Sequence, residues 1–345
     1  MKNKRPAIKD IASAIGVSIT TVSFVLNGKA EEKKISKEVT SKILKYAEKI
    51  KYKPNQLAQG LRTGKSKIIV FMVEDFYHFF AKVATIIEDL AYNKGYKVIF
   101  CTNENKDEKS IDLINLYKDI KVDGYIIIPS GGLMPKIKEL IEEGIPVVLF
   151  DRYFEELDTN QVTVDNEDAS FNATQHLIDN NFKNIGFVTI DLNQTQMQDR
   201  LCGYKAAIQK NLLQENIIKL PFEKYTLTRT NIEAKIKKYI ENNPQLDALF
   251  FSTNYLTISG LNTLKNNFPQ YTEKMGIISF DDLDFFEFYN PSISAIGQPY
   301  NEIANAIMDL MLNLLENPKK SERITKIKLK THLEIRDSTR VRGLV

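Results

Sequence analysis

Residues 8–23 read IKDIASAIGVSITTVS, and this stretch decides the fold of the N-terminal region. The apolar residues of its first half fall at the spacing i, i+3, i+4, i+7 of an amphipathic helix: Ile8, Ile11, Ala12 and Ile15. Gly16 permits the left-handed backbone that ends such a helix, and Ser18 is a suitable N-cap for the next one. The stretch therefore predicts two helices joined by a tight turn.

The second helix is expected to bury one apolar stripe, made of Val22, Val25 and Leu26. Thr20, Phe24 and Asn27 then share the opposite face. A third helix, capped by Ser36, is expected to run to about Ile50 with its apolar residues inward: Val39, Ile43, Leu44, Ala47 and Ile50. Three short helices of this kind form a compact helix-turn-helix head over residues 1–54.

Charge separates this head from the rest of the chain. The first 64 residues hold 14 Lys and Arg against 5 Asp and Glu, whereas the remaining 281 hold 33 against 39. A basic head on a mildly acidic body indicates a polyanionic partner for the head alone. The alternative from charge alone is a solvated, lysine-rich surface.

The body, residues 66–345, alternates strand-like apolar runs with helical stretches from Ile68–Val73 to Met275–Phe280. This order predicts parallel sheets covered by helices, in a series too long for one sheet. We therefore expect two Rossmann-like α/β lobes, the first covering about 66–162 and 295–322 and the second about 163–294 and 323–345. The late run Ile324–Leu333 alternates apolar and basic residues and predicts one further strand.

The second helix of a helix-turn-helix lies in the DNA major groove. Ile19, Thr20 and Phe24 are then the candidates for contact with base edges, and Thr21 and Ser23 for contact with phosphates. Ser18 and Asn27 also lie at this surface, where we interpret them mainly as helix caps. The alternative for Phe24 is that it packs into the core of the head.

Residues 55–65 contain a short helical pattern that begins after Pro54. A helix of this length with Gly60 inside it is unstable alone, so it is expected to form only when DNA holds it. Asn55 would cap it, and Leu61 would act as an apolar wedge in the minor groove. The alternative is a plain interdomain linker.

The head (residues 1–54) and the segment 55–65, here called the hinge, together resemble the lactose-repressor (LacI/GalR) family. The matching motifs are IKDIA at 8–12, GVS at 16–18, TVS at 21–23, VLNG at 25–28, and PNQLA at 54–58 followed by LRTG at 61–64; PVVLFDR at 146–152 and PSISAIGQP at 291–299 extend the likeness through the body. The resemblance implies a body of the periplasmic-binding-protein type, with two lobes joined by three crossovers and an effector in the cleft. It also implies a homodimer on double-stranded operator DNA, in which Ala58 would support Leu61 as the minor-groove wedge. The last helix would return to the first lobe and the strand Ile324–Leu333 to the second.

Ligands of open α/β sheets bind beyond the carboxyl ends of the strands. The effector candidates there are Phe79, Phe80, Asp151, Arg200, Asn254, Tyr255 and Asp281. Carboxylate, amide and guanidinium groups suit sugar hydroxyls, aromatic faces suit sugar rings, and Arg200 also permits a sugar acid or sugar phosphate. The alternatives are a core role for both phenylalanines and a cap or an Arg152 pairing for Asp151.

Enzyme classes find little support. The three histidines do not form a metal-ligand pair, and there is neither a Walker loop nor a G-x-S-x-G elbow. We therefore expect no catalytic site, metal or cofactor. Two distant cysteines, no membrane-length apolar run and no secretory signal favour a reducing cytoplasm. The sequence predicts a ligand-controlled repressor, with the ligand acting as inducer or, with reversed sign, as co-repressor; the rivals are a plain solute-binding protein and a sugar-modifying enzyme.

Overall fold

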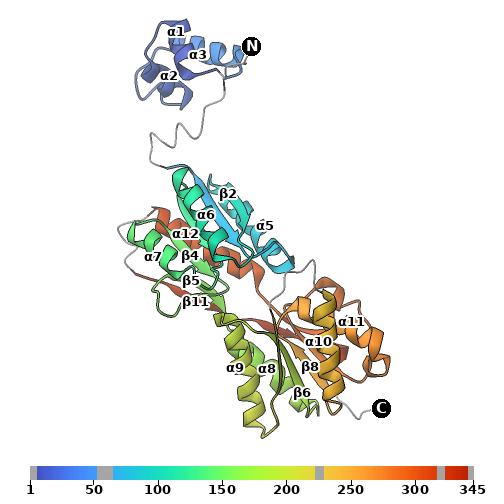
Figure 1. Cartoon of the computed structure of the whole chain (residues 1–345). Helices are drawn as coiled ribbons and strands as arrows, with labels where there is room; N and C mark the ends of the chain where they lie inside the picture. Colours follow the sequence, from blue (N-terminus) through green and yellow to red (C-terminus); the bar gives the residue numbers. More distant parts are fainter. Residues whose placement is uncertain (1–5, 53–64, 222–228, 317–322, 341–345) are drawn as a thin grey trace. The chain divides into compact units, whose positions relative to one another are not determined.

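The structure is a computed structural model that describes residues 6–52, 65–221, 229–316 and 323–340. The chain divides into two compact units, Met1–Ser66 and Lys67–Val345, and each is described by itself (Figure 1). The predicted hinge residues Asn55, Ala58 and Leu61 lie outside the described residues.

Within its described residues, 6–52 and 65–66, the first unit has three helices, α1 (Ile8–Ile15), α2 (Ile19–Leu26) and α3 (Lys37–Lys49). Gly16 ends α1 with a φ of 74°, and its N–H donates to the Ala12 carbonyl at 2.9 Å. Ser18 begins α2 by accepting a hydrogen bond from the Thr21 N–H at 3.0 Å. The predicted helix, turn and helix are therefore present, with Gly16 ending the first helix and Ser18 beginning the second.

A small apolar cluster holds the three helices together, with Ile11, Val22 and Ile43 fully buried at its centre. Leu44 was expected to face inward, but its side chain is 48% exposed. Consecutive helical residues point about 100° apart, so Leu44 turns outward once Ile43 faces the core. Phe24 is half-buried and lies outside this cluster, which removes the alternative that it is a core residue.

The second unit contains two six-stranded sheets. The first has the order β11-β5-β4-β3-β1-β2 and all its strands are parallel: β1 (Ile68–Val73), β2 (Lys97–Thr102), β3 (Gly124–Ile127), β4 (Val147–Phe150), β5 (Asn160–Val164) and β11 (Lys326–Leu329). One apolar cluster joins this sheet to α5 (His78–Asn93) and α12 (Tyr300–Glu316). A second cluster joins it to α6 (Asp107–Asp119) and α7 (Met134–Glu142). The last long helix therefore returns to the first lobe, as expected.

The second sheet has the order β12-β10-β9-β8-β6-β7, and only β12 runs antiparallel: β6 (Ile185–Ile190), β7 (Asn216–Leu220), β8 (Ala248–Phe251), β9 (Gly276–Phe280), β10 (Ser294–Gly297) and β12 (His332–Glu334). Helices α8 (Asn166–Asp179) and α9 (Thr195–Lys210) share one apolar cluster with it. Helices α10 (Arg229–Asn242) and α11 (Asn254–Asn267) share the other. Each lobe is thus a sheet of parallel strands, with β12 as the one antiparallel exception among the described strands, between two helical layers. The described part of the unit also has three short 3-10 helices: η1 (Pro269–Tyr271), η2 (Asp284–Phe286) and η3 (Asp337–Thr339).

The prediction of a single strand at Ile324–Leu333 is wrong, because two strands, β11 and β12, form there. β11 pairs with β5 in the first sheet, whereas β12 pairs with β10 in the second. Between them the Thr331 N–H donates to the Asp165 carboxylate at 2.8 Å, and Lys330 forms an ion pair with the same carboxylate at 3.2 Å. These contacts hold the chain where it crosses from one lobe to the other.

The lobe boundaries change accordingly. Residues 294–297 form β10 in the second sheet, so the first lobe resumes after Gly297 rather than at 295. The first lobe then continues through β11, and the second lobe resumes after Leu329 rather than at 323. The chain therefore passes between the lobes three times: after β5, after β10 and after β11.

Candidate functional site

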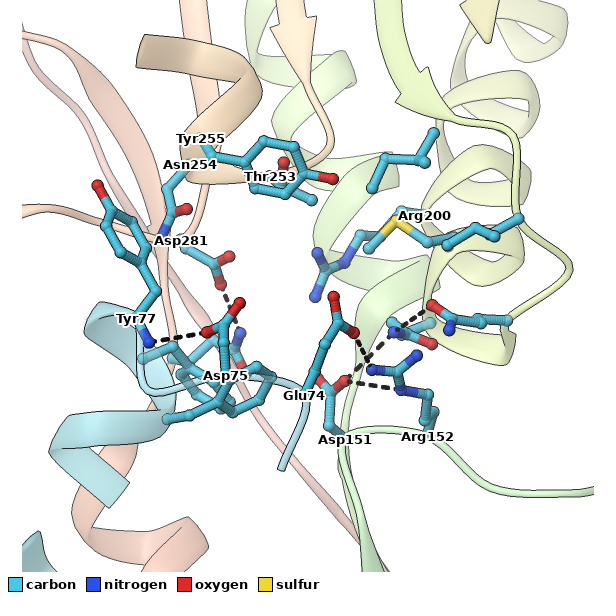
Figure 2. Close-up of a pocket in the computed structure, with 18 residues that line it drawn as sticks. Glu74, Asp75, Tyr77, Asp151, Arg152, Arg200, Thr253, Asn254, Tyr255 and Asp281 are labelled. Atoms are coloured by element: carbon cyan, nitrogen blue, oxygen red, sulfur yellow. Dashed lines mark hydrogen bonds and ion pairs between the residues drawn. The ribbon is translucent and has the colours of Figure 1, made fainter. Parts of the chain in front are cut away.

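A cavity of about 590 Å³, including its open mouth, lies where strands of both sheets end (Figure 2). Its walls come from both lobes, in agreement with the rule that ligands bind beyond the carboxyl ends of strands. All seven residues predicted for the effector site line it: Phe79, Phe80, Asp151, Arg200, Asn254, Tyr255 and Asp281.

Arg200 projects from α9 into the middle of this cavity (Figure 2). Its Nε donates to Asn166 Oδ1 at 2.9 Å, its Nη1 donates to the Ser252 carbonyl at 2.8 Å, and its guanidinium lies 3.5 Å from the centroid of the Phe280 ring. Burial lowers the pKa of Arg200, and the nearby Asp281 and Asp151 oppose that shift. Two nitrogens and one face of the guanidinium are thus fixed, which leaves Nη2 to meet a ligand.

Asp151 of the first lobe and Asp281 of the second lobe both line the cavity with their carboxylates. Asp151 accepts a hydrogen bond from Gln196 Nε2 at 3.2 Å and lies 3.8 Å from Arg152 Nε, so it lines the cavity and also forms the Arg152 pair that was considered as the alternative to a cavity role. Burial raises the pKa of Asp151 to about 6, although Arg152 and Arg200 act in the opposite direction. Asp281 accepts a hydrogen bond from Gln298 Nε2 at 2.5 Å. Both carboxylates keep oxygen lone pairs for ligand hydroxyls.

A polar chain crosses the cleft beside Asp151. Arg152 donates through Nη2 to Glu74 and through Nη1 to Asn105 Oδ1 at 3.2 Å. Gln194, from the second lobe, donates to the same Asn105 oxygen at 2.9 Å. A second contact between the lobes comes from Lys82 of α5, which donates to Asp284 of the second lobe at 2.9 Å. Hydrogen bonds therefore join the two lobes at both places.

Aromatic side chains form the apolar part of the wall. Phe79 is only 6% exposed and belongs to the core of the first lobe, and its ring meets Phe80 edge-on with centroids 5.1 Å apart. The two phenylalanines are therefore core residues and cavity residues at once. Tyr255 and Asn254 stand at the first turn of α11, which Thr253 caps by accepting a hydrogen bond from the Leu256 N–H at 3.4 Å.

Several polar lining residues were not predicted at the cleft: Glu74, Gln194, Gln196 and Gln298. Glu74 directly follows the predicted strand Ile68–Val73, so the rule that ligands bind beyond strand ends could have indicated it. Gln298 follows β10, a strand that was not predicted. Gln194 and Gln196 lie at the polar start of α9, nine and seven residues before Gly203, where the sequence alone predicts that a helix begins.

The exposed face of α2 carries the candidates for base contact. Ile19 is 52% exposed, Thr20 is exposed, and Lys33 lies 5.5 Å from the centroid of the half-buried Phe24 ring. Ser18 caps α2, and Asn27 Nδ2 donates to the Ser23 carbonyl at 2.7 Å, so both act as caps, as expected. Thr21 and Ser23 are half-buried beside them, with Thr21 Oγ1 2.9 Å from Ser18 Oγ.

Two family models together cover most of the chain. Residues 65–336 match the periplasmic binding proteins and sugar binding domain of the LacI family, and residues 7–55 match the bacterial regulatory proteins of the lacI family. The sucrose operon repressor of Lactococcus lactis subsp. lactis is 32% identical over 90% of this chain and 93% of its own length. The chain belongs to the LacI family. It is a DNA-binding transcriptional repressor of this family with a sugar-binding domain.

Other LacI-family proteins agree. Catabolite control protein A of Priestia megaterium is 28% identical over 96% of this chain and 99% of its own length. A lac repressor dimer bound to operator and the anti-inducer ONPF has a TM-score of 0.82 at 18% identity, with 98% of this chain and all of that one covered. A LacI-family regulator from Enterococcus faecium with bound ribose has a TM-score of 0.69 at 22% identity; the match covers 80% of this chain and 100% of the other. These solved structures confirm the fold, and the named relatives are regulators rather than enzymes.

Two further properties of this LacI-family chain concern its described residues only. Among them, no group of three His, Cys, Asp or Glu side chains is arranged to hold a metal ion. No single described helix has the length and apolar character to cross a membrane, and only the bent pair of α1 and α2 passes that test jointly.

Proposed function

We propose that this repressor binds a specific operator as a homodimer and that an uncharged sugar in the cavity between the lobes controls its affinity for DNA. The observation that carries the choice of ligand is the balance of charge around the cavity. Four carboxylates line it, those of Glu74, Asp75, Asp151 and Asp281, against the two guanidinium groups of Arg152 and Arg200.

Both guanidinium groups already have acidic neighbours. Arg152 is 3% exposed and is bound by Glu74 and Asn105, so its charge is neutralised before a ligand arrives. Arg200 faces Asp281 and Asp151, which favour its charged form. An added phosphate or carboxylate would therefore meet a net negative wall, which opposes binding in a buried site. A polyol can instead donate hydroxyl hydrogens to the carboxylates and accept a hydrogen bond from Arg200 Nη2.

The proposed control is a shift between two arrangements of the lobes. Ligand contacts from both walls favour one arrangement of the cleft, and the dimer holds the DNA-binding heads on the two halves of an operator only in the other. The ligand is proposed to act as an inducer. Support for the dimer comes from the similar fold of the operator-bound lac repressor dimer.

A thermal-shift panel tests the choice of ligand. The full-length chain is heated with neutral pentoses, hexoses and disaccharides, and with the phosphate and acid derivatives of the same sugars. A neutral sugar should raise the melting temperature and its phosphorylated form should not. A larger shift with the charged derivative would overturn the neutral assignment, and sedimentation of the ligand-free chain as a monomer at micromolar concentration would overturn the dimer.

An enzyme that modifies sugars is the competing class, and the LacI-family head at residues 7–55 argues against it. Turnover of the sugar that stabilises the protein would support that competitor. Unchanged sugar after prolonged incubation supports the regulator.

A further inference from the structure

The recognition helix α2 has an unusual side-chain composition for a base-reading element. Its eight residues are ITTVSFVL, with no charged side chain and no amide. Specific readout of guanine commonly uses Arg or Lys on O6 and N7, and readout of adenine commonly uses Asn or Gln on N6 and N7. No residue within α2 is able to make either bidentate contact.

The flanking polar groups are already engaged in the geometry of the head. Ser18 Oγ accepts the Thr21 N–H, and the Asn27 amide donates to the carbonyl of Ser23 and, at 3.3 Å, to its hydroxyl. Using the Asn27 amide to read adenine would break the C-cap of α2. Thr20 is the exposed α2 residue whose hydroxyl makes no hydrogen bond within the described residues.

Apolar surface is what α2 offers instead. Ile19, the first residue of the helix, is 52% exposed. The buried aliphatic residues of α2, Val22 and Val25, lie further along the helix. Phe24 lies outside the head's apolar cluster, and the Lys33 ammonium stands 5.5 Å from its ring centroid. Lys33 also pairs with Glu32 at 2.8 Å, so this cation is held beside the ring rather than extended from it.

We propose that Ile19 and Phe24 determine operator specificity by packing against the 5-methyl groups of thymine in the major groove, so that the half-site contacted by α2 is rich in A·T pairs. The thymine methyl is the apolar feature of the major groove, and Thr or Phe side chains meet it there. Thr20 adds one hydroxyl and one methyl to the same surface. This inference rests on the proposed operator binding and names the chemistry that α2 recognises.

The test removes methyl groups from DNA without changing its hydrogen-bonding edges. Duplexes are first selected by the full-length chain from a random-sequence pool. The thymines of each selected half-site are then replaced by deoxyuridine, and thymines in the flanks are replaced in a control duplex. Each contacted methyl should contribute about fourfold in affinity, from about 0.8 kcal/mol per buried carbon. Flank replacement should leave the dissociation constant unchanged.

Two variants connect the methyl effect to the named residues. Ile19→Ala, at an exposed site that tolerates substitution, and Phe24→Ala should each reduce the difference between thymine and uracil duplexes. Leu44→Ala, exposed at 48% on α3 of the same head, is the matched control and should keep the full difference.

Equal affinity for thymine and uracil half-sites would overturn the inference while leaving operator binding intact. A selected half-site dominated by G·C pairs would also overturn it. Failure to enrich any sequence would instead count against the proposed sequence-specific function, so the two failures are distinguishable.

Discussion

Asp151 and Asp281 occupy matching positions in the two lobes. Asp151 directly follows β4 and Asp281 directly follows β9, and both adopt the left-handed backbone, with φ of 68° and 71°. Such a conformation is uncommon for a residue other than glycine, although Asp tolerates it better than most. Each lobe thus ends a central strand with a sharp turn that presents one carboxylate to the shared cavity.

Replacing Asp151 by Asn should stabilise the ligand-free protein at pH 7.5. Burial raises the pKa of Asp151 to about 6 in the folded state, from 3.8 in the unfolded chain. Its contribution to folding is therefore fully present below pH 3.8 and is lost as the pH rises through about 6. The neutral Asn avoids that loss, so the variant should gain up to about 3 kcal/mol at pH 7.5, with the gap closing toward pH 4. Urea unfolding of both proteins across this range measures it, and a gap that does not vary with pH would contradict the explanation.

Replacing Arg200 by Lys should abolish stabilisation by the ligand. The lysine keeps the charge but loses the planar group that bonds Asn166 and Ser252 and faces the cavity with Nη2. The unpaired buried partners should also lower the unfolding free energy by about 1–3 kcal/mol. Arg336→Lys is the matched control, because Arg336 holds Asp282 through two bonds of 2.9 and 2.7 Å away from the cavity lining. A normal ligand-induced thermal shift in the Arg200 variant would remove Arg200 from the binding site.

Gln194→Ala should weaken ligand binding by about fivefold, mainly through faster dissociation. This change removes the 2.9 Å bond from Gln194 to Asn105 that joins the lobes over the cavity. One hydrogen bond contributes about 1 kcal/mol, which corresponds to that factor. Stopped-flow dissociation of the stabilising sugar gives the rate, with the exposed Gln245→Ala as control. Identical dissociation rates in the two variants would argue against this bond as part of cleft closure.

Gly203→Ala should destabilise the second lobe by about 1–3 kcal/mol. A methyl group at Gly203 would overlap the Glu167 carbonyl of α8, because α8 and α9 approach closely at this point. The same approach holds Asn166 of α8 against Arg200 of α9. Gly131→Ala, where no atom lies within 4 Å of the added carbon, should change stability by less than about 0.5 kcal/mol. Equal unfolding midpoints for these two variants would contradict the packing explanation.

The sequence predicted the head closely because residues with specific geometry mark its helix boundaries: Gly16 ends α1, Ser18 begins α2 and Ser36 begins α3. It placed Asp151 and Asp281 correctly because apolar strands precede them. The sequence did not show that the C-terminal run divides into two strands near Lys330. The apolar and polar residues keep alternating after Lys326–Leu329, although β11 pairs with β5 and β12 pairs with β10. Gln194 was missed because α9 begins with a polar turn, and its contact with Asn105 joins residues 89 positions apart, which local periodicity does not report.

The central claim is that a sugar between the lobes and an operator on the heads share one equilibrium. Fluorescence anisotropy with the full-length chain and a selected operator, without and with the stabilising neutral sugar at saturation, tests it most directly. The account predicts that the sugar raises the operator dissociation constant by about 5- to 150-fold and that operator raises the sugar's dissociation constant by the same factor. Operator and sugar that both bind, each with an affinity unchanged by the other, would contradict it.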